Sequence, residues 1–185
     1  RPIPVEATAT VQDKVVAIIG PATSGGMKAQ IQLSAKNSVP IVSGSATADD
    51  LTVSNGKLND FIFRTCFTDS YQGTVMANYA ASKLNAKTAV VLKDTSSDYA
   101  KGLADNFDKQ FTAKGGQVVA TEAYTAKQTD FNAVLTKLKG QQFDIMYVPG
   151  YYEELGLIIK QARALGITAP ITGGDGYESP KLAEL

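Results

Sequence analysis

The stretch Val15-Val16-Ala17-Ile18-Ile19-Gly20-Pro21-Ala22-Thr23-Ser24-Gly25-Gly26 decides the fold of this chain, because an apolar, β-branched run leads at once into a loop of small residues. The same order recurs at Ile41-Val42, which is followed by Ser43-Gly44-Ser45-Ala46-Thr47. A small-residue loop that leaves a strand and enters a helix presents backbone N–H groups and hydroxyls where the helix dipole favours negative charge. Both loops therefore predict strand-loop-helix units that hold a small anionic group.

The composition predicts an ordered globular protein and excludes several classes of function. Of the 185 residues, 44% are hydrophobic and 19% are charged. The 18 Lys and Arg balance the 18 Asp and Glu, so nothing suggests a nucleic-acid partner. No run of about 18 apolar residues could span a bilayer. The start, Arg1-Pro2-Ile3-Pro4, is not followed by an apolar signal segment, so we expect any export signal to lie outside this sequence.

The chain offers few groups for catalysis, since it contains no histidine and one cysteine, Cys66. The lack of histidine argues against Ser-His-Asp hydrolysis and against an ordinary zinc site. Cys66 has no second cysteine to pair with, and we expect it to be a buried thiol without a catalytic role. The sequence therefore predicts a binding protein rather than an enzyme, with no catalytic residue, no metal and no cofactor.

Strands and helices alternate along the chain. Several strands are near-continuous Val, Ile and Ala runs, as is typical of parallel strands covered on both faces. Apolar residues recur at helical spacing between them, as at Leu103, Phe107 and Phe111. Asp69 and Asp98 are each expected to cap the helix that follows. Repeated units of this kind predict an α/β fold with doubly wound parallel sheets. The predicted strands are 14–19, 40–43, 61–65, 88–92, 117–122, 144–148 and 170–172.

The pattern divides the chain into two predicted lobes. Residues 48–60 form the least regular stretch and are expected to be a polar loop. We place the boundary just after the strand that follows, so that residues 1–67 form a partial first lobe and residues 68–185 a second lobe, with a hinge near 65–68. The first lobe holds only two or three strands, fewer than a usual sheet, whereas the second holds four.

Polar side chains follow the predicted strands, and in α/β sheets ligands bind at these strand ends. The first strand leads to Ser24, and the second leads to a loop that holds Ser45, Ala46 and Thr47. Their hydroxyls and N–H groups suit a carboxylate. Asp175 is the only acid in a glycine-rich strand-end loop, and it suits an ammonium through a charge-assisted hydrogen bond. The sequence therefore predicts a site for a small zwitterion.

Tyr99 and Tyr151 also follow predicted strands and can form a wall against an apolar side chain of the ligand. Each of these residues has a plainer interpretation. Ser24 can simply cap a helix, Asp175 can belong to an ordinary turn, and the two tyrosines can be packing residues. Their occurrence at successive strand ends favours a binding site.

The sequence lacks two motifs that are typical of nucleotide-binding proteins. A phosphate loop requires Gly-Lys-Ser/Thr, whereas the chain continues Gly25-Gly26-Met27-Lys28. No G-x-G-x-x-G sequence follows a strand either. A nucleotide-binding enzyme with a Rossmann-like fold is therefore the weaker alternative.

These residues resemble the type I periplasmic binding proteins, and most closely the branch that binds leucine, isoleucine and valine for ABC importers. The resemblance covers nearly the whole chain and depends on the order and spacing of several short stretches. These stretches are residues 16–25, 39–43, 63–65, 69–73, 98–102, 130–131, 150–154, 161–163 and 173–176.

The resemblance implies two Rossmann-like lobes that close about the hinge on an amino acid in the inter-lobe cleft. It implies that Ser24 holds the ligand carboxylate and that the loop with Ser45 and Thr47 grips both the carboxylate and the ammonium. Asp175 matches the acid that pairs with the ammonium, although this branch often has Glu there.

The resemblance further implies that Tyr99 and Tyr151 contact the ligand on closure. The partner implied is an ABC permease in the membrane, and the location is extracytoplasmic, either in the periplasm or as a cell-surface lipoprotein. By comparison with the family, the chain is expected to be truncated at both ends. A ligand-binding sensor or receptor domain of the same fold remains an alternative.

Overall fold

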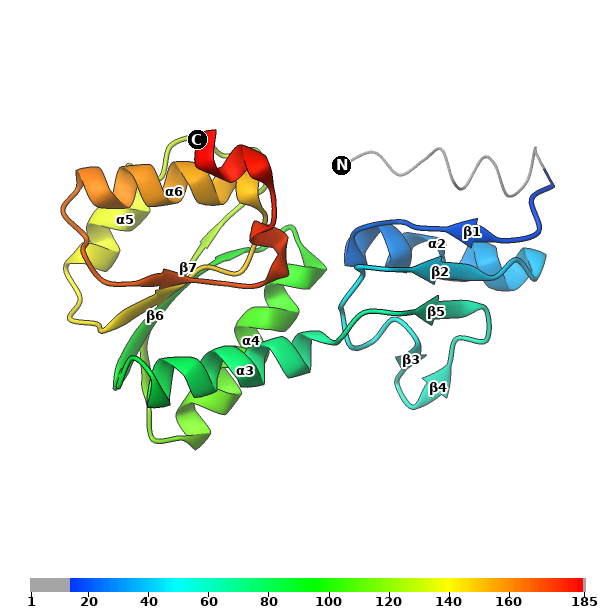
Figure 1. Cartoon of the computed structure of the whole chain (residues 1–185), viewed down its shortest axis with the longest axis horizontal. Helices are drawn as coiled ribbons and strands as arrows, with labels where there is room; N and C mark the ends of the chain where they lie inside the picture. The colour runs from blue at the N-terminus through cyan, green and yellow to red at the C-terminus, as the bar shows by residue number, and fades with distance from the viewer. Residues whose placement is uncertain (1–13, 185) are drawn as a thin grey trace. The chain divides into compact units, whose positions relative to one another are not determined.

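The computed structural model describes residues 14–184 and divides the chain into two compact units, Arg1–Asp69 and Ser70–Leu185. Each unit has its own parallel sheet (Figure 1). Within the described residues, no helix is both long enough and apolar enough to cross a membrane.

The first unit contains a parallel sheet with the strand order β1-β2-β5 and a separate antiparallel hairpin of β3 and β4. Its elements are β1 (Ile18–Ile19), α2 (Ser24–Asn37), β2 (Ile41–Ser43), β3 (Val53–Ser54), β4 (Lys57–Leu58) and β5 (Ile62–Arg64). Three parallel strands agree with the two or three predicted. The first strand is shorter than the predicted 14–19, because only Ile18 and Ile19 pair with β2.

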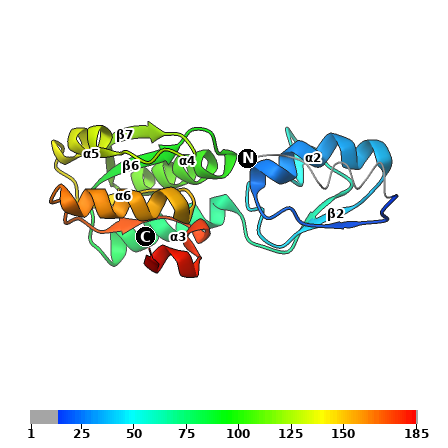
Figure 2. The ribbon, with the colours of Figure 1, turned by 90° about the horizontal axis from the view of Figure 1, so that it is seen from above.

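One face of this sheet forms the core of the first unit. Ile18, Ile41 and Ile62 are paired across the three strands, and all three side chains are buried. They belong to one apolar cluster with Met27 of α2, which is also buried. The helix therefore covers this face, as Figure 2 shows for α2 and β2.

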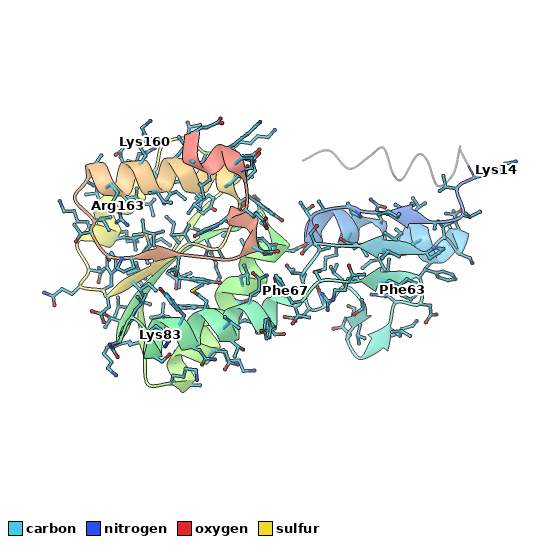
Figure 3. The ribbon with its side chains drawn as sticks, in the orientation of Figure 1. Lys14, Phe63, Phe67, Lys83, Lys160 and Arg163 are labelled. Carbon is cyan, nitrogen blue, oxygen red and sulfur yellow. The ribbon has the colours of Figure 1, made fainter. Side chains whose placement is uncertain are left out.

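The opposite face carries a second apolar row, formed by Ile19, Val42 and Phe63. These residues directly follow those of the buried row, and successive side chains of a strand point to opposite faces. Ile19 is 93% exposed and Phe63, labelled in Figure 3, is 48% exposed. Among the described residues of the first unit, no helix packs on this row.

The predicted loop 48–60 contains a small hairpin that the sequence interpretation missed. Strands β3 and β4 pair through Val53 with Leu58 and Ser54 with Lys57. Asn55 and Gly56 form the turn, with φ values of 51° and 75°. Positive φ at both central residues is the mark of a type I′ turn, for which Asn-Gly is the preferred sequence. The Asn-Gly pair was therefore the signal for this hairpin, and the strands beside it are only two residues long.

The second unit has the four strands that were predicted, and they form a parallel sheet in the order β7-β6-β8-β9. The elements around this sheet are α3 (Asp69–Ser82), β6 (Thr88–Asp94), α4 (Asp98–Ala113), β7 (Gln117–Tyr124), α5 (Asn132–Lys139), β8 (Ile145–Tyr147), α6 (Tyr152–Ala164) and β9 (Ile171–Thr172), followed by the short 3₁₀ turns η1 (Asp175–Tyr177) and η2 (Pro180–Glu184).

Helices cover both faces of the second sheet (Figure 1). Alternate residues of β6 explain this arrangement, since Ala89 and Val91 join the apolar cluster of α3 and α4. Val90 and Leu92 instead join the cluster of α5 and α6. All four are buried, which explains why the strand reads as a continuous apolar run. The predicted doubly wound α/β fold is confirmed.

The cap of α4 lies one residue before the predicted Asp98, and the alternative interpretation in which Ser24 caps a helix is wrong. Thr23, not Ser24, caps α2, and its Oγ1 accepts a hydrogen bond from the Gly26 N–H at 3.2 Å. Ser97 rather than Asp98 caps α4, because Ser97 has the extended backbone (φ −113°, ψ 120°) that a cap requires. Asp98 is the first helical residue, where its negative charge complements the helix dipole.

Asp144 links the starts of two strands in the second unit and gives a pH-dependent prediction. Its Oδ2 accepts hydrogen bonds from the backbone N–H groups of Lys87 (2.7 Å) and Thr88 (2.9 Å), and these bonds lower the pKa of the Asp144 carboxyl. A carboxyl whose pKa is lowered by folding stabilises the folded state above its unfolded pKa of about 3.9 and loses this effect as the pH falls through the folded value.

We therefore expect Asp144→Asn to reduce the free energy of unfolding at neutral pH, and the difference from the parent chain to shrink in acid. Urea denaturation at several pH values measures this difference. Asp108→Asn is the control, since Asp108 is an exposed carboxyl on α4 that, among the described residues, accepts a hydrogen bond only from the Thr112 hydroxyl of the same helix. If Asp144→Asn lowers the free energy of unfolding equally at every pH, the charge of Asp144 does not contribute to stability.

Candidate functional site

Side-chain hydrogen bonds join the two loops of the first unit that the sequence singled out. The Ser43 hydroxyl donates to the Pro21 carbonyl at 2.7 Å, and the Ser45 hydroxyl donates to the Ala22 carbonyl at 2.8 Å. The loop after β2 is thereby fixed to the loop after β1. Both loops lie at the carboxyl ends of paired parallel strands, where ligands of α/β sheets bind.

Ser24 belongs to the same arrangement. It is the first residue of α2 and is 1% exposed, and its Oγ accepts a hydrogen bond from the Ala48 N–H at 3.0 Å. Since Thr23 is the cap, the interpretation of Ser24 as an ordinary helix cap is wrong. The Ser24 hydroxyl instead holds the end of the second loop.

Ala46 and Thr47 form the buried part of the second loop. The Ala46 N–H donates to the Ser43 hydroxyl at 3.0 Å. The Thr47 Oγ1 is buried and has no hydrogen-bond partner within residues 14–184. A buried hydroxyl without a partner is costly, so this loop retains one unused hydrogen-bonding group.

Arg64 supports this loop and was missed by the sequence interpretation. From the end of β5, its guanidinium donates to the carbonyls of Thr47 (3.1 Å) and Ala48 (2.6 Å). A guanidinium that holds two neighbouring carbonyls fixes the backbone between them. Arg64 is the only charged residue of a strand that otherwise reads Ile-Phe, which was the available signal.

In the second unit, the structure brings Tyr99 and Asp175 into direct contact. The Tyr99 hydroxyl donates to the Asp175 Oδ1 at 2.6 Å and accepts from the Gly176 N–H at 2.9 Å. Burial, followed by the negative charge of Asp175, raises the pKa of the Tyr99 hydroxyl far above its usual value. The hydroxyl therefore remains a proton donor to the carboxylate.

Tyr151 completes the predicted group in this unit. Its ring centroid lies 5.1 Å from that of Tyr99, with the two planes tilted by 30°. Tyr99 is 3% exposed and is part of the core cluster beneath the sheet, whereas Tyr151 is half-buried. The packing interpretation of Tyr99 is thus correct for its ring, and its hydroxyl additionally contacts Asp175.

Gln72 is a second residue that the sequence interpretation did not place at the site. Its Oε1 accepts a hydrogen bond from the Asp175 N–H at 3.0 Å, so α3 holds the backbone of the glycine-rich loop. The stretch Tyr71-Gln72-Gly73 contributed to the family resemblance without suggesting this role. Gln72 and Asp175 are separated by 103 positions, and no local pattern connects them.

The described part of the chain contains no group of three or more His, Cys, Asp or Glu residues placed to hold a metal ion. Cys66 is half-buried, so the expectation that its thiol is fully buried was wrong. Its Sγ lies 3.5 Å from the Ala46 carbonyl, at the loop described above.

The chain has two α/β units with polar loops at the ends of their parallel strands. Comparison with known families shows which class of protein has this arrangement. The chain belongs to the periplasmic binding protein family, whose model matches residues 6–185. This confirms the resemblance on which the sequence interpretation depended.

Several relatives are themselves named as binding proteins for branched-chain amino acids. The Leu/Ile/Val-binding protein BraC3 of Rhizobium johnstonii is 36% identical over 173 residues, which are 94% of this chain and 46% of that protein. LivJ of Streptococcus pneumoniae, a branched-chain amino acid transporter substrate binding protein solved with isoleucine, is 46% identical, with a TM-score of 0.86 over 96% of this chain and 49% of LivJ. The leucine binding protein LivK of Thermotoga maritima is 39% identical, with a TM-score of 0.90 over 96% of this chain and 49% of LivK. The chain thus spans about half the length of these relatives.

Proposed function

We propose that this chain carries the ligand-binding residues of a solute-binding protein for an ABC importer, and that the ligand is a branched-chain or similar small amino acid. The observation that carries the proposal is the Asp175 carboxylate, which Tyr99 holds in a glycine-rich loop at a strand end. A carboxylate held in this way suits a ligand ammonium. The relatives support the same ligand class, since one is named for Leu, Ile and Val and another was solved with isoleucine.

We propose that the first unit binds the ligand carboxylate through Ser24, Ser45, Ala46 and Thr47. Helix α2 has no acidic residue in its first turn, so the partial positive charge at its N-terminus is not neutralised within the helix. The loop also holds the Thr47 hydroxyl, which has no hydrogen-bond partner in the described part of the chain. In the second unit, the half-buried Tyr151 is proposed to contact the apolar side chain of the ligand.

The remaining parts of the proposal concern the whole protein. We propose an extracytoplasmic location and a hinge at residues 65–68, about which the two units close on the ligand. A membrane permease would then recognise the closed form. Binding and release need no chemical step, so none is assigned to the residues above.

Calorimetric titration of the purified chain with leucine, isoleucine, valine and alanine tests the proposal. We expect micromolar or tighter binding of at least one of them, and no heat with ATP or NAD. Heat with a nucleotide but with no amino acid would favour a nucleotide-binding enzyme. The absence of heat with all four amino acids, both for the 185-residue chain and for the product of its complete gene, would contradict the proposal. A signalling domain in that gene would favour a sensor over a transport protein.

Ser24→Ala gives a smaller, local prediction. The variant removes the acceptor of the buried Ala48 N–H and one proposed ligand contact, so we expect amino-acid affinity to fall by about 1–2 kcal/mol. Ser34→Ala is the matched control, since Ser34 is an equally buried serine of α2 whose hydroxyl donates to the Val39 carbonyl at 2.6 Å, away from these loops. Equal affinities for the parent chain and Ser24→Ala, or equal losses in both variants, would remove the assignment of Ser24.

A further inference from the structure

The hydroxyl of Tyr99 lies between two groups of the loop that carries Asp175. It donates to the Asp175 Oδ1 at 2.6 Å and accepts from the Gly176 N–H at 2.9 Å. One side chain from α4 thus fixes both the carboxylate and the next peptide group. A hydroxyl has one proton to donate, and here that proton is used on Asp175.

Two glycines make room for this contact. A Cβ on Gly174 would lie 2.6 Å from the Tyr99 hydroxyl, and a Cβ on Gly176 would lie 2.4 Å from the Gly150 carbonyl oxygen and 3.0 Å from Cε1 of the Tyr99 ring. Neither glycine has a left-handed backbone, so the requirement at both positions is space rather than conformation. The Gly-Asp-Gly sequence therefore fits around the buried tyrosine.

The contact also determines which part of Asp175 remains available. Within residues 14–184, the Oδ1 atom has the Tyr99 hydroxyl as its hydrogen-bond partner, whereas Oδ2 has none. The backbone of the same residue is fixed independently, because its N–H donates to the Gln72 Oε1 at 3.0 Å. These two hydrogen bonds fix the direction of the Asp175 carboxylate. The residue is half-buried and therefore partly open to solvent.

We infer that Tyr99 is a positioning residue, which acts on the ligand through Asp175 by directing the free carboxylate oxygen toward the ligand amino group. This differs from the expectation that Tyr99 contacts the ligand itself, since its ring belongs to the core of the second unit. The inference rests on the proposed function. Its consequence is selectivity, because a ligand without an amine leaves the fixed carboxylate without a partner.

Tyr99→Phe tests this inference with two ligands, leucine and 4-methylpentanoate, which is leucine without its amino group. The variant keeps the ring and removes the hydroxyl. We expect the affinity for leucine to fall by about tenfold, as for the loss of a hydrogen bond to a charged group, and the affinity for 4-methylpentanoate to stay the same. A tyrosine that only supports the fold, or that contacts the apolar part of the ligand, would affect both ligands equally. An equal loss for both, or no loss for either, would overturn the inference.

Tyr177→Phe is the matched control. Tyr177 lies in the same loop and is half-buried, and its hydroxyl donates to the Val148 carbonyl at 2.6 Å, so its removal also costs one hydrogen bond. We expect the ratio of the two affinities to change in Tyr99→Phe and to remain unchanged in Tyr177→Phe. A similar change in both variants would mean that general loosening of the loop explains the result.

A double-mutant cycle, measured on the free energy of unfolding, tests the Tyr99–Asp175 contact independently of the proposed function. Urea denaturation of Tyr99→Phe, Asp175→Ala and the double variant measures whether the two residues are coupled in the folded chain, since each single variant removes the hydrogen bond between them. We expect the double variant to lose less stability than the sum of the single variants, and additive losses would overturn the inference. If the cycle shows coupling but the unaltered chain binds no amino acid, the proposed function fails while the Tyr99–Asp175 contact stands.

Discussion

Replacement of Asp175 by asparagine is expected to lower the affinity for leucine by two orders of magnitude or more. In the proposed complex the Asp175 carboxylate is the charged partner of the ligand ammonium. Removal of one partner of a buried ion pair leaves the other charge unpaired, at a cost of about 3–5 kcal/mol. Asparagine has the same shape and can still accept the hydrogen bond from Tyr99, so the loop should keep its conformation. Calorimetric titration measures the loss.

Glu178→Gln is the matched control for this variant. Glu178 is an exposed acid in the same segment, and its replacement changes the net charge by the same amount. We expect the affinity of Glu178→Gln for leucine to match that of the parent chain. Equal losses in the two variants would point to the overall charge of the second unit. Unchanged affinity in Asp175→Asn would remove the assignment of the ammonium partner.

Replacement of Phe107 by alanine is expected to cause the largest loss of stability. Its ring is fully buried in the cluster between the sheet and α3 and α4. It stacks on Tyr147 with a centroid distance of 4.1 Å and on Phe111 at 5.3 Å. Loss of a large buried side chain removes its transfer free energy and leaves a cavity, so we expect a loss of about 3–5 kcal/mol.

Urea denaturation followed by circular dichroism measures this loss, and Tyr79→Ala is the control. Tyr79 is an aromatic residue of α3 in the same unit but is 45% exposed. Its replacement should change the free energy of unfolding by no more than about 0.5 kcal/mol. A loss below about 1 kcal/mol for Phe107→Ala would mean that the cluster closes around the missing ring.

The fold followed from the sequence because its signals were local. The run Val90-Val91-Leu92 is apolar at every position since both sheet faces are covered, and this marks a parallel strand. Several of the errors concern single positions at element ends. Ser97 and Asp98 are both good capping residues, and only the backbone angles decide between them. Two-residue strands such as β3 bury too little to leave a pattern.

The candidate site was predictable only in part. Ser24, the loop at Ser45 and Asp175 all follow strands directly, so topology alone brings each to a strand end. Arg64 and Gln72 could not be found in this way, because each holds the backbone of a residue distant in the sequence. Every residue has the same backbone groups, so a hydrogen bond to the backbone does not require a particular residue type at the position that is held. The sequence therefore contains no pattern that reveals such a bond.

The second apolar row of the first sheet, formed by Ile19, Val42 and Phe63, has a practical consequence for experiments on this chain. Dyes such as ANS fluoresce on accessible apolar surface and are commonly used to detect partly folded states. Ile19 is 93% exposed in the folded chain, so the native protein should itself bind such a dye. Dye fluorescence at low temperature would then not by itself indicate a partly folded state. Thermal melts of the variants above are better followed by circular dichroism, which records the helices directly.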